Sequence, residues 1–349
     1  MEPITRRSLL SGLAGVTLAP FAVDPHAWAA VYGGYEVPAE VLSLYQANRS
    51  WIGLPTSARI AVTGGFKQKF QHADLYYGKS VGASIVTSHI KSAYDAKGGP
   101  AYLGLPIGTQ KTSTTYSSRT QRFADGRIWW SSAHGSKVVR ETKTVRLSGA
   151  PNFRDIAGEG SGIAVTGGRM KRGIAYRSST TSSITRMDKF ILQTLDVGTL
   201  VALSPSSVAN VTGIDRARYQ LNNPSSQTLA EKKRMYAQYV SSAANRASIG
   251  KAIQFLAGSD EAVVFQCLRG WDRTGWFAAV IQGLLGASSS TIMSEFLKSN
   301  DYYGNGVQSA YLNAAISEMK SRYGSYRGYA TACGVSSSRI STLRAKLVD

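Results

Sequence analysis

Residues 261–286 constrain the fold more than any other part of the chain. A short apolar run of β type leads into Cys267, five residues separate this cysteine from Arg273, and an apolar helical stretch follows. This order predicts a strand, a tight loop and a helix. A five-residue loop can curl so that its backbone N–H groups point inward, and the N-terminus of the helix adds its positive dipole. The segment therefore predicts a cradle for a phosphate group with a thiol at its mouth.

The residue types in this loop suit phosphate chemistry. The positive field of the cradle favours the thiolate form of Cys267, which is the nucleophilic form. The planar guanidinium of Arg273 can bind two phosphate oxygens at once and follow them into the transition state. The hydroxyl of Thr274 can donate to the thiolate. The residues expected to bind phosphate are Leu268, Arg269, Gly270, Trp271, Thr274 and Gly275.

Two interpretations of Asp272 stay open. It can be the general acid that protonates the leaving oxygen, or it can form a structural salt bridge inside the loop. The spacing from Cys267 to Arg273 is itself common by chance, and alone it would fit a buried, inert cysteine equally well. The preceding strand, the glycines at 270 and 275 and the following helix favour the catalytic interpretation.

The string around Cys267 resembles the C-x-x-G-K-D-R-T-G signature of the bacterial tyrosine phosphatase family that includes secreted mycobacterial enzymes with dual protein and lipid specificity. Upstream, residues 152–155 are similar to the family's N-F-R-D opening, and residues 172–179 to its strand ending in R-S. The resemblance covers 144–349 and implies a phosphocysteine intermediate with no metal and no cofactor. It also implies that Arg154 and Asp155 support the catalytic loop.

The chain departs from the family pattern around the loop. Gln266 stands where the family has a His that orients the loop, and Trp271 replaces the loop Lys. Ala202 and Ser204 stand where the family has the Asp and Arg of a D-L-R segment. Arg269 restores part of the positive charge, and Trp271 can stack on a substrate ring or pack as a lid. The substrate therefore stays open among phosphotyrosine, phosphoserine or phosphothreonine, and phosphoinositide.

Residues 1–29 have the layout of an export signal. The pair Arg6 and Arg7 precedes a weakly apolar stretch, and Ala27-Trp28-Ala29 forms a small-x-small cleavage site. The arginine pair resembles a twin-arginine signal, and the general secretory route stays open. The apolar stretch is shorter than the ~20 residues that a spanning helix needs. We expect a secreted or cell wall-associated protein without a transmembrane segment.

The net charge of +19 belongs to the mature chain, because the charges of the signal nearly cancel. Such a balance favours anionic partners, among them phosphorylated proteins, phosphoinositide headgroups and acidic wall polymers. The sequence contains no nucleic-acid-binding module and no zinc-ligand spacing. We therefore expect neither a nucleic acid nor a metal as a partner.

Residues 30–140 contain an internal repeat of about fifty residues. The motif WIGLP at 51–55 recurs as YLGLP at 102–106, and FQHADLYY at 70–77 recurs as FADGRIWW at 123–130. The turns and short aromatic strands of each module are typical of β-rich structure. The modules resemble LGFP repeats of exported actinobacterial proteins, and the resemblance implies a tether to cell-wall polysaccharide.

The repeated aromatic pairs allow two interpretations. Tyr76, Tyr77, Trp129 and Trp130 can stack on sugar faces if they are exposed. Strand alternation instead favours burial of at least one member of each pair in a small β core.

The two cysteines, Cys267 and Cys333, are far apart in the sequence. A disulfide between them would block the thiol, and packing of Cys333 at a helix end is the favoured interpretation. The four histidines all precede residue 144, so no His is local to Cys267 in sequence. This argues against a Cys-His hydrolase.

We predict an α/β protein, with a phosphatase-like sheet flanked by helices at 144–349 and a small β-rich repeat domain at 30–140 before it. The composition of residues 204–226 predicts a loop near the site, and the pattern at 227–243 predicts an exposed helix that covers the site. The β runs of the second domain are expected at 174–177, 198–203 and 262–266, and its helices at 186–195, 227–257, 275–286, 291–298 and 308–322.

The combined prediction is a secreted cysteine-dependent phosphatase, a protein-tyrosine-phosphatase tethered to the cell wall by its repeats. The alternative is a catalytically weak or inactive protein that uses the phosphatase fold to bind anionic cell-surface ligands. Gln266, Trp271 and the missing D-L-R segment favour this alternative. The joint presence of Cys267 and Arg273 disfavours it, because a loop that only binds phosphate needs no thiol.

Overall fold

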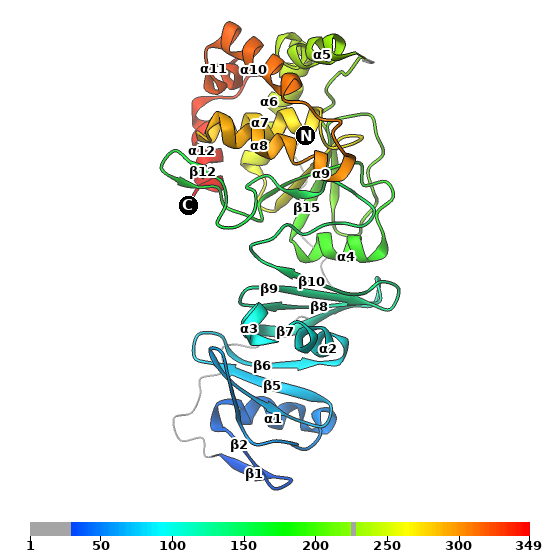
Figure 1. Ribbon diagram of the computed structural model, residues 1–349, viewed down its shortest axis with the longest axis vertical. Coiled ribbons are helices and arrows are strands. Elements are labelled where there is room, and N and C mark those ends of the chain that lie inside the picture. The colour runs from blue at the N-terminus through cyan, green and yellow to red at the C-terminus, as the bar shows by residue number, and fades with distance from the viewer. Residues whose placement is uncertain (1–28, 225–227) are drawn as a thin grey trace, which may run out of the picture.

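The structure, a computed structural model, describes residues 29–224 and 228–349. The molecule is elongated, with the repeats at one end and the phosphatase-like part at the other (Figure 1). The export signal predicted at 1–29 falls, except for its last residue, outside the described residues. Within the described ranges, no helix is long and apolar enough to cross a membrane.

Each repeat consists of helical structure followed by a four-stranded antiparallel sheet, which confirms the β-rich prediction. The first sheet contains β3 (Ile60–Val62), β4 (Gly65–Lys69), β5 (Ala73–Gly78) and β6 (Gly82–Thr87). The second sheet contains β7 (Pro106–Ser113), β8 (Ser118–Phe123), β9 (Gly126–Ser131) and β10 (Gly135–Arg140). A hairpin of β1 (Ala30–Tyr32) and β2 (Tyr35–Val37) precedes them.

The helices of the repeats were not predicted. They are α1 (Ala39–Ile52) before the first sheet, and α2 (Ser88–Ala96) and α3 (Pro100–Leu103) before the second. Their apolar stripes are short, because α1 buries only four residues and α2 only Ile90 and Tyr94. Such sparse stripes give a weak helical signal in the sequence.

Helices and sheets alternate along the repeat end of the molecule. Helix α2 lies between the two sheets, where Tyr94 shares one apolar cluster with Tyr76 of the first sheet and Phe123 of the second. Helix α4 (Arg186–Thr194) of the phosphatase-like part then lies against strands β8 and β9 of the second sheet. The stacking order is α1, first sheet, α2, second sheet and α4 (Figure 1).

The phosphatase-like part is built on a five-stranded sheet, which we call the main sheet, with the order β11-β14-β17-β15-β16. All its pairs are parallel except β11 with β14. Its strands are β11 (Arg154–Asp155), β14 (Ala175–Ser178), β15 (Val197–Ala202), β16 (Asp215–Arg218) and β17 (Ala262–Gln266). Strand β16 lies inside the segment 204–226, where we expected only a loop. A separate small hairpin contains β12 (Ala164–Val165) and β13 (Gly168–Arg169).

Helices cover the main sheet on both faces, which confirms the predicted α/β class. One face packs in a large apolar cluster with most of the helices, and the other packs against α4. The helices of the first group are α5 (Leu229–Ser241), α6 (Ala243–Gly258), α7 (Arg273–Leu285), α8 (Ser289–Leu297), α9 (Asn300–Tyr303), α10 (Ser309–Tyr323), α11 (Tyr326–Ala332) and α12 (Ser337–Leu347).

The segment expected as one helix at 227–257 is two helices. Ser242 ends α5 with an extended backbone and begins α6, where its side chain accepts a hydrogen bond from the amide of Asn245. A serine in this conformation is a favoured N-cap. Helix α5 is also less exposed than we expected, since it buries Met235, Tyr236, Tyr239 and Val240.

Candidate active site

Cys267 directly follows β17, the middle strand of the main sheet, and is 2% exposed. The loop from 267 to 272 leads into α7, which begins at Arg273. The carboxyl end of a central parallel strand is where open α/β sheets bind their ligands. The strand-loop-helix order that we predicted is therefore present, with the thiol at the ligand-binding edge of the sheet.

Gly270 lets the loop curl against the end of β14. Its φ of +69° lies in the left-handed region, and a Cβ at this position would lie 2.4 Å from the carbonyl carbon and oxygen of Ser178. Only glycine satisfies both conditions without displacing backbone. The loop is therefore packed tightly onto the sheet from behind.

A cavity of about 210 Å³ opens in front of the loop. From the loop itself it is lined by six predicted residues, which are Cys267, Leu268, Arg269, Trp271, Asp272 and Arg273. Asn223, Pro224 and Lys232 line it from the opposite side. Leu268 is 61% exposed at the mouth. Three further predicted residues, Gly270, Thr274 and Gly275, are buried and do not line the cavity.

The hydroxyl of Thr274 is fully buried and has no hydrogen-bond partner among the described residues. It follows Arg273 in the first turn of α7, and donation to the thiolate stays a prediction. Arg273 lies at the rim of the cavity and is half-buried, and its Nε donates to the carbonyl of Leu221 at 3.0 Å. The chain segment at 219–224 therefore contacts the arginine on which phosphate binding is expected to depend.

Asp272 is held by three groups. Its Oδ1 accepts a hydrogen bond from the hydroxyl of Tyr236 at 2.8 Å, and its Oδ2 accepts one from the indole N–H of Trp271 at 2.7 Å. The ammonium of Lys232 lies 3.5 Å from the same Oδ2. A salt bridge inside the site is thus present, with Lys232 as the partner and not the neighbouring Arg273.

Trp271 packs as part of the wall of the site and is 8% exposed. Its ring meets that of Tyr303 edge to face at 5.1 Å, and the guanidinium of Arg269 lies 4.9 Å from its centre. A Cβ on Gly306 would lie 3.1 Å from the ring. Of the two roles considered for Trp271, this packing favours a fixed cover over a platform for a substrate ring.

Gln266 braces the two loops beside the catalytic one. Its Oε1 accepts from the amide of Thr181 at 3.0 Å, and its Nε2 donates to the carbonyl of Ser207 at 3.0 Å. An amide that both donates and accepts can join two backbones in this way. On the edge strand β16, Arg218 donates to the carbonyls of Ser204 and Ser206. These contacts brace the region where the family has its D-L-R segment.

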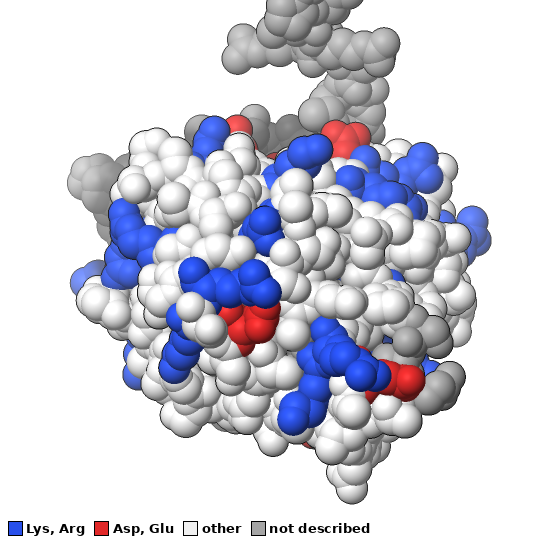
Figure 2. Space-filling view, turned by 90° about the horizontal axis from the view of Figure 1, so that it is seen from above, with Lys and Arg blue, Asp and Glu red and all other residues white. Residues whose placement is uncertain are grey.

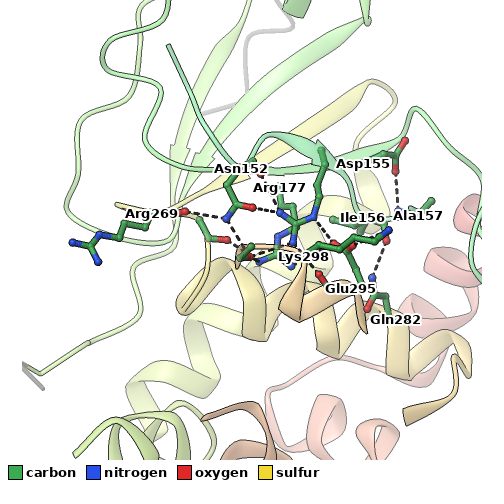
Figure 3. Close-up of polar contacts among 12 residues, drawn as sticks. Asn152, Asp155, Ile156, Ala157, Arg177, Arg269, Gln282, Glu295 and Lys298 are labelled. Carbon is green, nitrogen blue, oxygen red and sulfur yellow. Dashed lines mark hydrogen bonds and ion pairs between the residues drawn. The ribbon is translucent and has the colours of Figure 1, made fainter. Parts of the chain in front are cut away.

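A buried arginine cluster lies behind the loop (Figure 3). It consists of Arg154, Arg177 and Glu295, together with Asn152 and Ser299. Oε1 of Glu295 lies 2.8 Å from Nε of Arg154 and 3.5 Å from Nη1 of Arg177. Burial and, to a lesser extent, the charge of Arg154 lower the pKa of Arg177 to about 9, while the carboxylate of Glu295 opposes the shift. Arg177 is therefore still protonated at neutral pH.

Asp155 supports a turn and does not contact the catalytic loop. Its two oxygens accept from the amides of Ala157 at 2.8 Å and Gly173 at 2.6 Å. Burial raises the pKa of Asp155 to about 6. Of the two residues expected to support the loop, Arg154 belongs to the buried arginine cluster, and Asp155 fixes the connection between β11 and β14.

Both cysteines are free and buried. Cys333 is the C-cap of α11, so packing at a helix end describes it correctly, and burial raises the pKa of its thiol to about 12. Among residues 29–224 and 228–349, no group of three or more His, Cys, Asp or Glu side chains could hold a metal ion.

Five residues of the site were missed by the sequence reasoning, namely Asn152, Arg177, Lys232, Tyr236 and Glu295. A signal existed for Arg177, because a charged residue inside a predicted buried strand needs a partner. Glu295 gave no such signal, since it lies on a helix whose sequence resembles any amphipathic surface helix. Only the packing of α8 brings it to the loop.

Comparison with known proteins assigns the family. Residues 145–349 match the model of the tyrosine phosphatase family, and residues 52–101 and 103–145 match the LGFP repeat. The chain belongs to the tyrosine phosphatase family. This confirms the predicted family and enzyme class, and the predicted repeats. No curated protein sequence matches the chain.

Several solved phosphatase structures are similar to part of this chain. TpbA of P. aeruginosa in complex with pTyr is 17% identical, covers 48% of this chain and 88% of its own, and has a TM-score of 0.33. The PP-IP phosphatase SIW14 of S. cerevisiae is 15% identical, with coverages of 51% and 96% and a TM-score of 0.32. OH1 of the Orf virus, a tyrosine phosphatase, is 14% identical, with coverages of 52% and 87% and a TM-score of 0.21.

Proposed function

We propose that this protein is an exported, wall-tethered phosphatase that hydrolyses phosphate monoesters through a phosphocysteine intermediate. The observation that carries the catalytic part is the position of Cys267, at the end of a central parallel strand, in one cavity with Arg273 and the loop. Proposed substrates are phosphotyrosine proteins, with phosphoserine, phosphothreonine or phosphoinositide as further candidates. Seen from the end that carries α5, α10 and α11, the surface shows more Lys and Arg than Asp and Glu, which suits anionic substrates (Figure 2).

In the proposed reaction, Cys267, Arg273 and the loop N–H groups each have a role. The sulfur of Cys267 forms a bond to phosphorus as the bond from phosphorus to the leaving oxygen breaks. Arg273 and the loop N–H groups bind the equatorial oxygens. Water then attacks phosphorus, the bond to sulfur breaks, and inorganic phosphate and the thiolate are released. No step in this sequence requires a redox reagent.

Asp272 is the carboxyl group in position to give the leaving oxygen its proton, because it lines the cavity beside the thiol. To act, it must carry a proton in the phosphate complex, and its contacts with Tyr236, Trp271 and Lys232 must allow this. The two interpretations of Asp272 make different predictions. Loss of an acid slows esters with poor leaving groups far more than activated aryl esters, whereas loss of a structural salt bridge slows both alike.

The test is phosphate release by reduced protein, residues 30–349, on an aryl phosphate, a phosphotyrosine peptide and phosphoinositide vesicles. Cys267→Ser should abolish turnover and retain phosphate binding. Turnover that survives this substitution would mean that the nucleophile is another group. Asp272→Asn, assayed on esters of differing leaving group, decides between the acid and the salt bridge.

The tether is proposed on the repeats, and the structure changes which aromatics are suited to it. Tyr76 and Trp129 are buried, which confirms that one member of each aromatic pair fills the core. Trp130 is half-buried, and one face of its ring is stacked on His89 at 4.0 Å. Trp51 and Tyr102 occupy equivalent positions in the two repeats and are 45% and 37% exposed. Exposed aromatic faces of this kind can stack on sugars.

The tether test is co-sedimentation of the protein with purified cell walls. The double variant Trp51→Ala with Tyr102→Ala should lose wall binding and keep phosphatase activity. A matched control is Leu229→Ala, which truncates an exposed apolar residue outside the repeats. Wall binding equal to wild type in the double variant would remove these two rings from the proposal.

The second candidate is a protein that binds anionic ligands without turnover. It is favoured by the contact of Arg273 with the carbonyl of Leu221, which occupies one of the donors that would otherwise face phosphate. This candidate predicts that wild type binds inorganic phosphate and releases none from any ester. In that case, Cys267→Ser should bind phosphate as well as wild type does.

A further inference from the structure

The buried arginine cluster contacts the catalytic loop at two places. Nη2 of Arg177 donates to the carbonyl of Gly270 at 2.8 Å. Arg154 donates through Nη1 to Oδ1 of Asn152, and Nδ2 of Asn152 donates to the carbonyl of Arg269 at 3.0 Å. Arg177 thus binds the carbonyl of Gly270 directly, and Arg154 is linked to the carbonyl of Arg269 through the side-chain amide of Asn152. The side chain of Arg269 itself points away from the cluster (Figure 3).

These contacts determine which way two peptide groups face. No peptide bond in the described residues is cis, and in a trans peptide the N–H points opposite to the C=O. Because the carbonyls of Arg269 and Gly270 are bound from behind, the N–H groups of Gly270 and Trp271 point toward the front of the loop. A flipped peptide would turn a carbonyl oxygen toward bound phosphate, which would repel it.

The carboxylate of Glu295 forms an ion pair with both arginines. Oε1 of Glu295 is shared by Arg154 and Arg177, and the three side chains are 3%, 4% and 1% exposed respectively. Nη2 of Arg154 also donates to the carbonyl of Glu295 at 2.9 Å. Two buried cations that repel each other need such a bridge to keep a fixed spacing. Without it, the two guanidinium groups would separate and take the loop carbonyls with them.

We infer that Glu295 of α8 is a positioning residue of the catalytic loop, which acts through Arg177 and through Arg154 with Asn152 to hold two amide donors toward the phosphate. The inference deepens the proposed function and rests on it, because the orientation of these amides matters only if the cavity takes phosphate. Through these residues α8, which does not line the cavity, affects the affinity of the loop for its anion.

The main test substitutes Glu295→Gln, which keeps the shape of the side chain and removes its charge. Turnover of an aryl phosphate and inhibition by orthovanadate are measured on the same protein as above, residues 30–349. Misplaced donors should lower kcat by about 100-fold, with KM changed much less. The inhibition constant for orthovanadate should rise by a comparable factor, since vanadate uses the same donors.

A second variant tests the inference if Glu295→Gln does not fold. Asn152 has a φ of +64°, which glycine adopts freely. Asn152→Gly therefore keeps the backbone and removes the side-chain contacts with the carbonyl of Arg269, with Arg154 and with Ser299. We expect a loss of kcat of about tenfold, smaller than for Glu295→Gln because only one of the two loop carbonyls loses its donor. The matched control is Glu318→Gln, which breaks the exposed pair of Glu318 with Arg322 in the same domain. It should leave kcat and vanadate inhibition unchanged.

A merely structural role for the cluster gives another pattern. Circular dichroism with urea denaturation reports the folded fraction of each variant. A structural role would lower that fraction and leave kcat per folded molecule and vanadate affinity at the wild-type values, which would overturn the inference. If wild type binds vanadate but shows no turnover, the proposed function fails while the affinity series still tests the loop. Equal vanadate affinity in wild type, Glu295→Gln and Asn152→Gly would overturn the inference in that case too.

Discussion

The two repeats bury the same sheet face against helices of different origin. The first sheet packs on α2, which directly follows it in the chain, whereas the second sheet packs on α4, which belongs to the phosphatase-like domain. In the repeated sequence, Tyr76 corresponds to Trp129 and Asp74 to Arg127. Helix α4 of the phosphatase-like domain therefore takes the same place beside the second sheet that α2 takes beside the first.

At the first interface the polar residue is satisfied by ion pairs. Asp74 lies 3.4 Å from the ammonium of Lys67 and 3.5 Å from that of Lys91 on α2. The ring of Tyr76 meets that of Tyr94 edge to face at 5.7 Å. The hydroxyl of Tyr76 is buried and has no hydrogen-bond partner among the described residues.

At the second interface the polar residues bind the end of a helix. Nη1 of Arg127 donates to the carbonyl of Thr194 at 2.6 Å, and Nε1 of Trp129 donates to its hydroxyl at 2.7 Å. Thr194 is the last residue of α4, where carbonyls lack partners within the helix and a cation complements the helix dipole. The same apolar face thus packs against two different helices. The polar residue beside it differs with the helix, since Asp74 pairs with Lys91 on α2 and Arg127 binds the carbonyl at the end of α4.

Truncation should have the largest effect. Removal of residues 29–140 takes Tyr116 and Trp129 out of the apolar cluster that they share with α4 and the main sheet. The remaining domain should lose more than about 5 kcal/mol in its free energy of unfolding, measured by urea denaturation. Removal of residues 29–87 alone is the control, because it leaves the second interface whole. Equal stability of the two truncated proteins would mean that the second sheet does not support the phosphatase-like domain.

The single substitution Trp129→Ala should cost about 3–5 kcal/mol, the usual range for a large aromatic side chain in a core. Trp129 is 1% exposed and also donates a hydrogen bond, so its removal leaves a cavity and takes one donor from the hydroxyl of Thr194. The neighbouring Trp130→Ala is the matched control, because that ring lies half-exposed on the other face of the strand. Chemical denaturation of the two variants should separate them clearly.

The second interface should also respond to pH. Asp155 lines a cavity there together with Arg127 and Trp129, and burial raises its pKa to about 6. A raised carboxyl pKa contributes stability that is fully present below about pH 4 and is lost as pH rises through 6. The difference in unfolding free energy between wild type and Asp155→Asn should therefore shift by about 3 kcal/mol between pH 4 and 7. A flat difference would contradict this assignment.

Arg127→Met should lower stability by about 1–3 kcal/mol, because the carbonyl of Thr194 loses its donor inside the interface. The corresponding change in the first repeat, Asp74→Asn, removes an ion-paired group and tests the other kind of polar contact. Thermal unfolding at two salt concentrations distinguishes them. Salt should alter the effect of Asp74→Asn more than that of Arg127→Met, since only the former breaks a pair of opposite charges.

The smallest effect is expected for Tyr76→Phe. The substitution removes a buried hydroxyl that has no partner, so stability should stay within about 1 kcal/mol of wild type or rise. Its counterpart at the second interface is Thr194→Val, which removes the acceptor for Trp129 and should destabilise. A large loss with Tyr76→Phe would mean that the hydroxyl is bound after all, for instance by a buried water.

Local sequence signals located the elements that carry the catalytic loop. The strand at 262–266 and the helix after Arg273 are where the apolar runs predicted them, because both are buried on nearly every side and their composition is uniformly apolar. The repeat was visible because its motifs recur at fixed spacing. The helices of the repeats and strand β16 were missed, since their short apolar stripes are too weak to exceed the turn signals around them.

By itself, the sequence determined the α/β class, the family, the repeats and the loop residues that line the cavity beside Cys267, because these depend on local order along the chain. Only the tertiary structure decided that Glu295, Arg177 and Asn152 meet behind the loop, that Lys232 pairs with Asp272, and that the second repeat uses α4 as its neighbour. These pairings join residues that are far apart in sequence. They arise from helix packing and from the need of buried charges for partners, and neither leaves a periodic pattern in the chain.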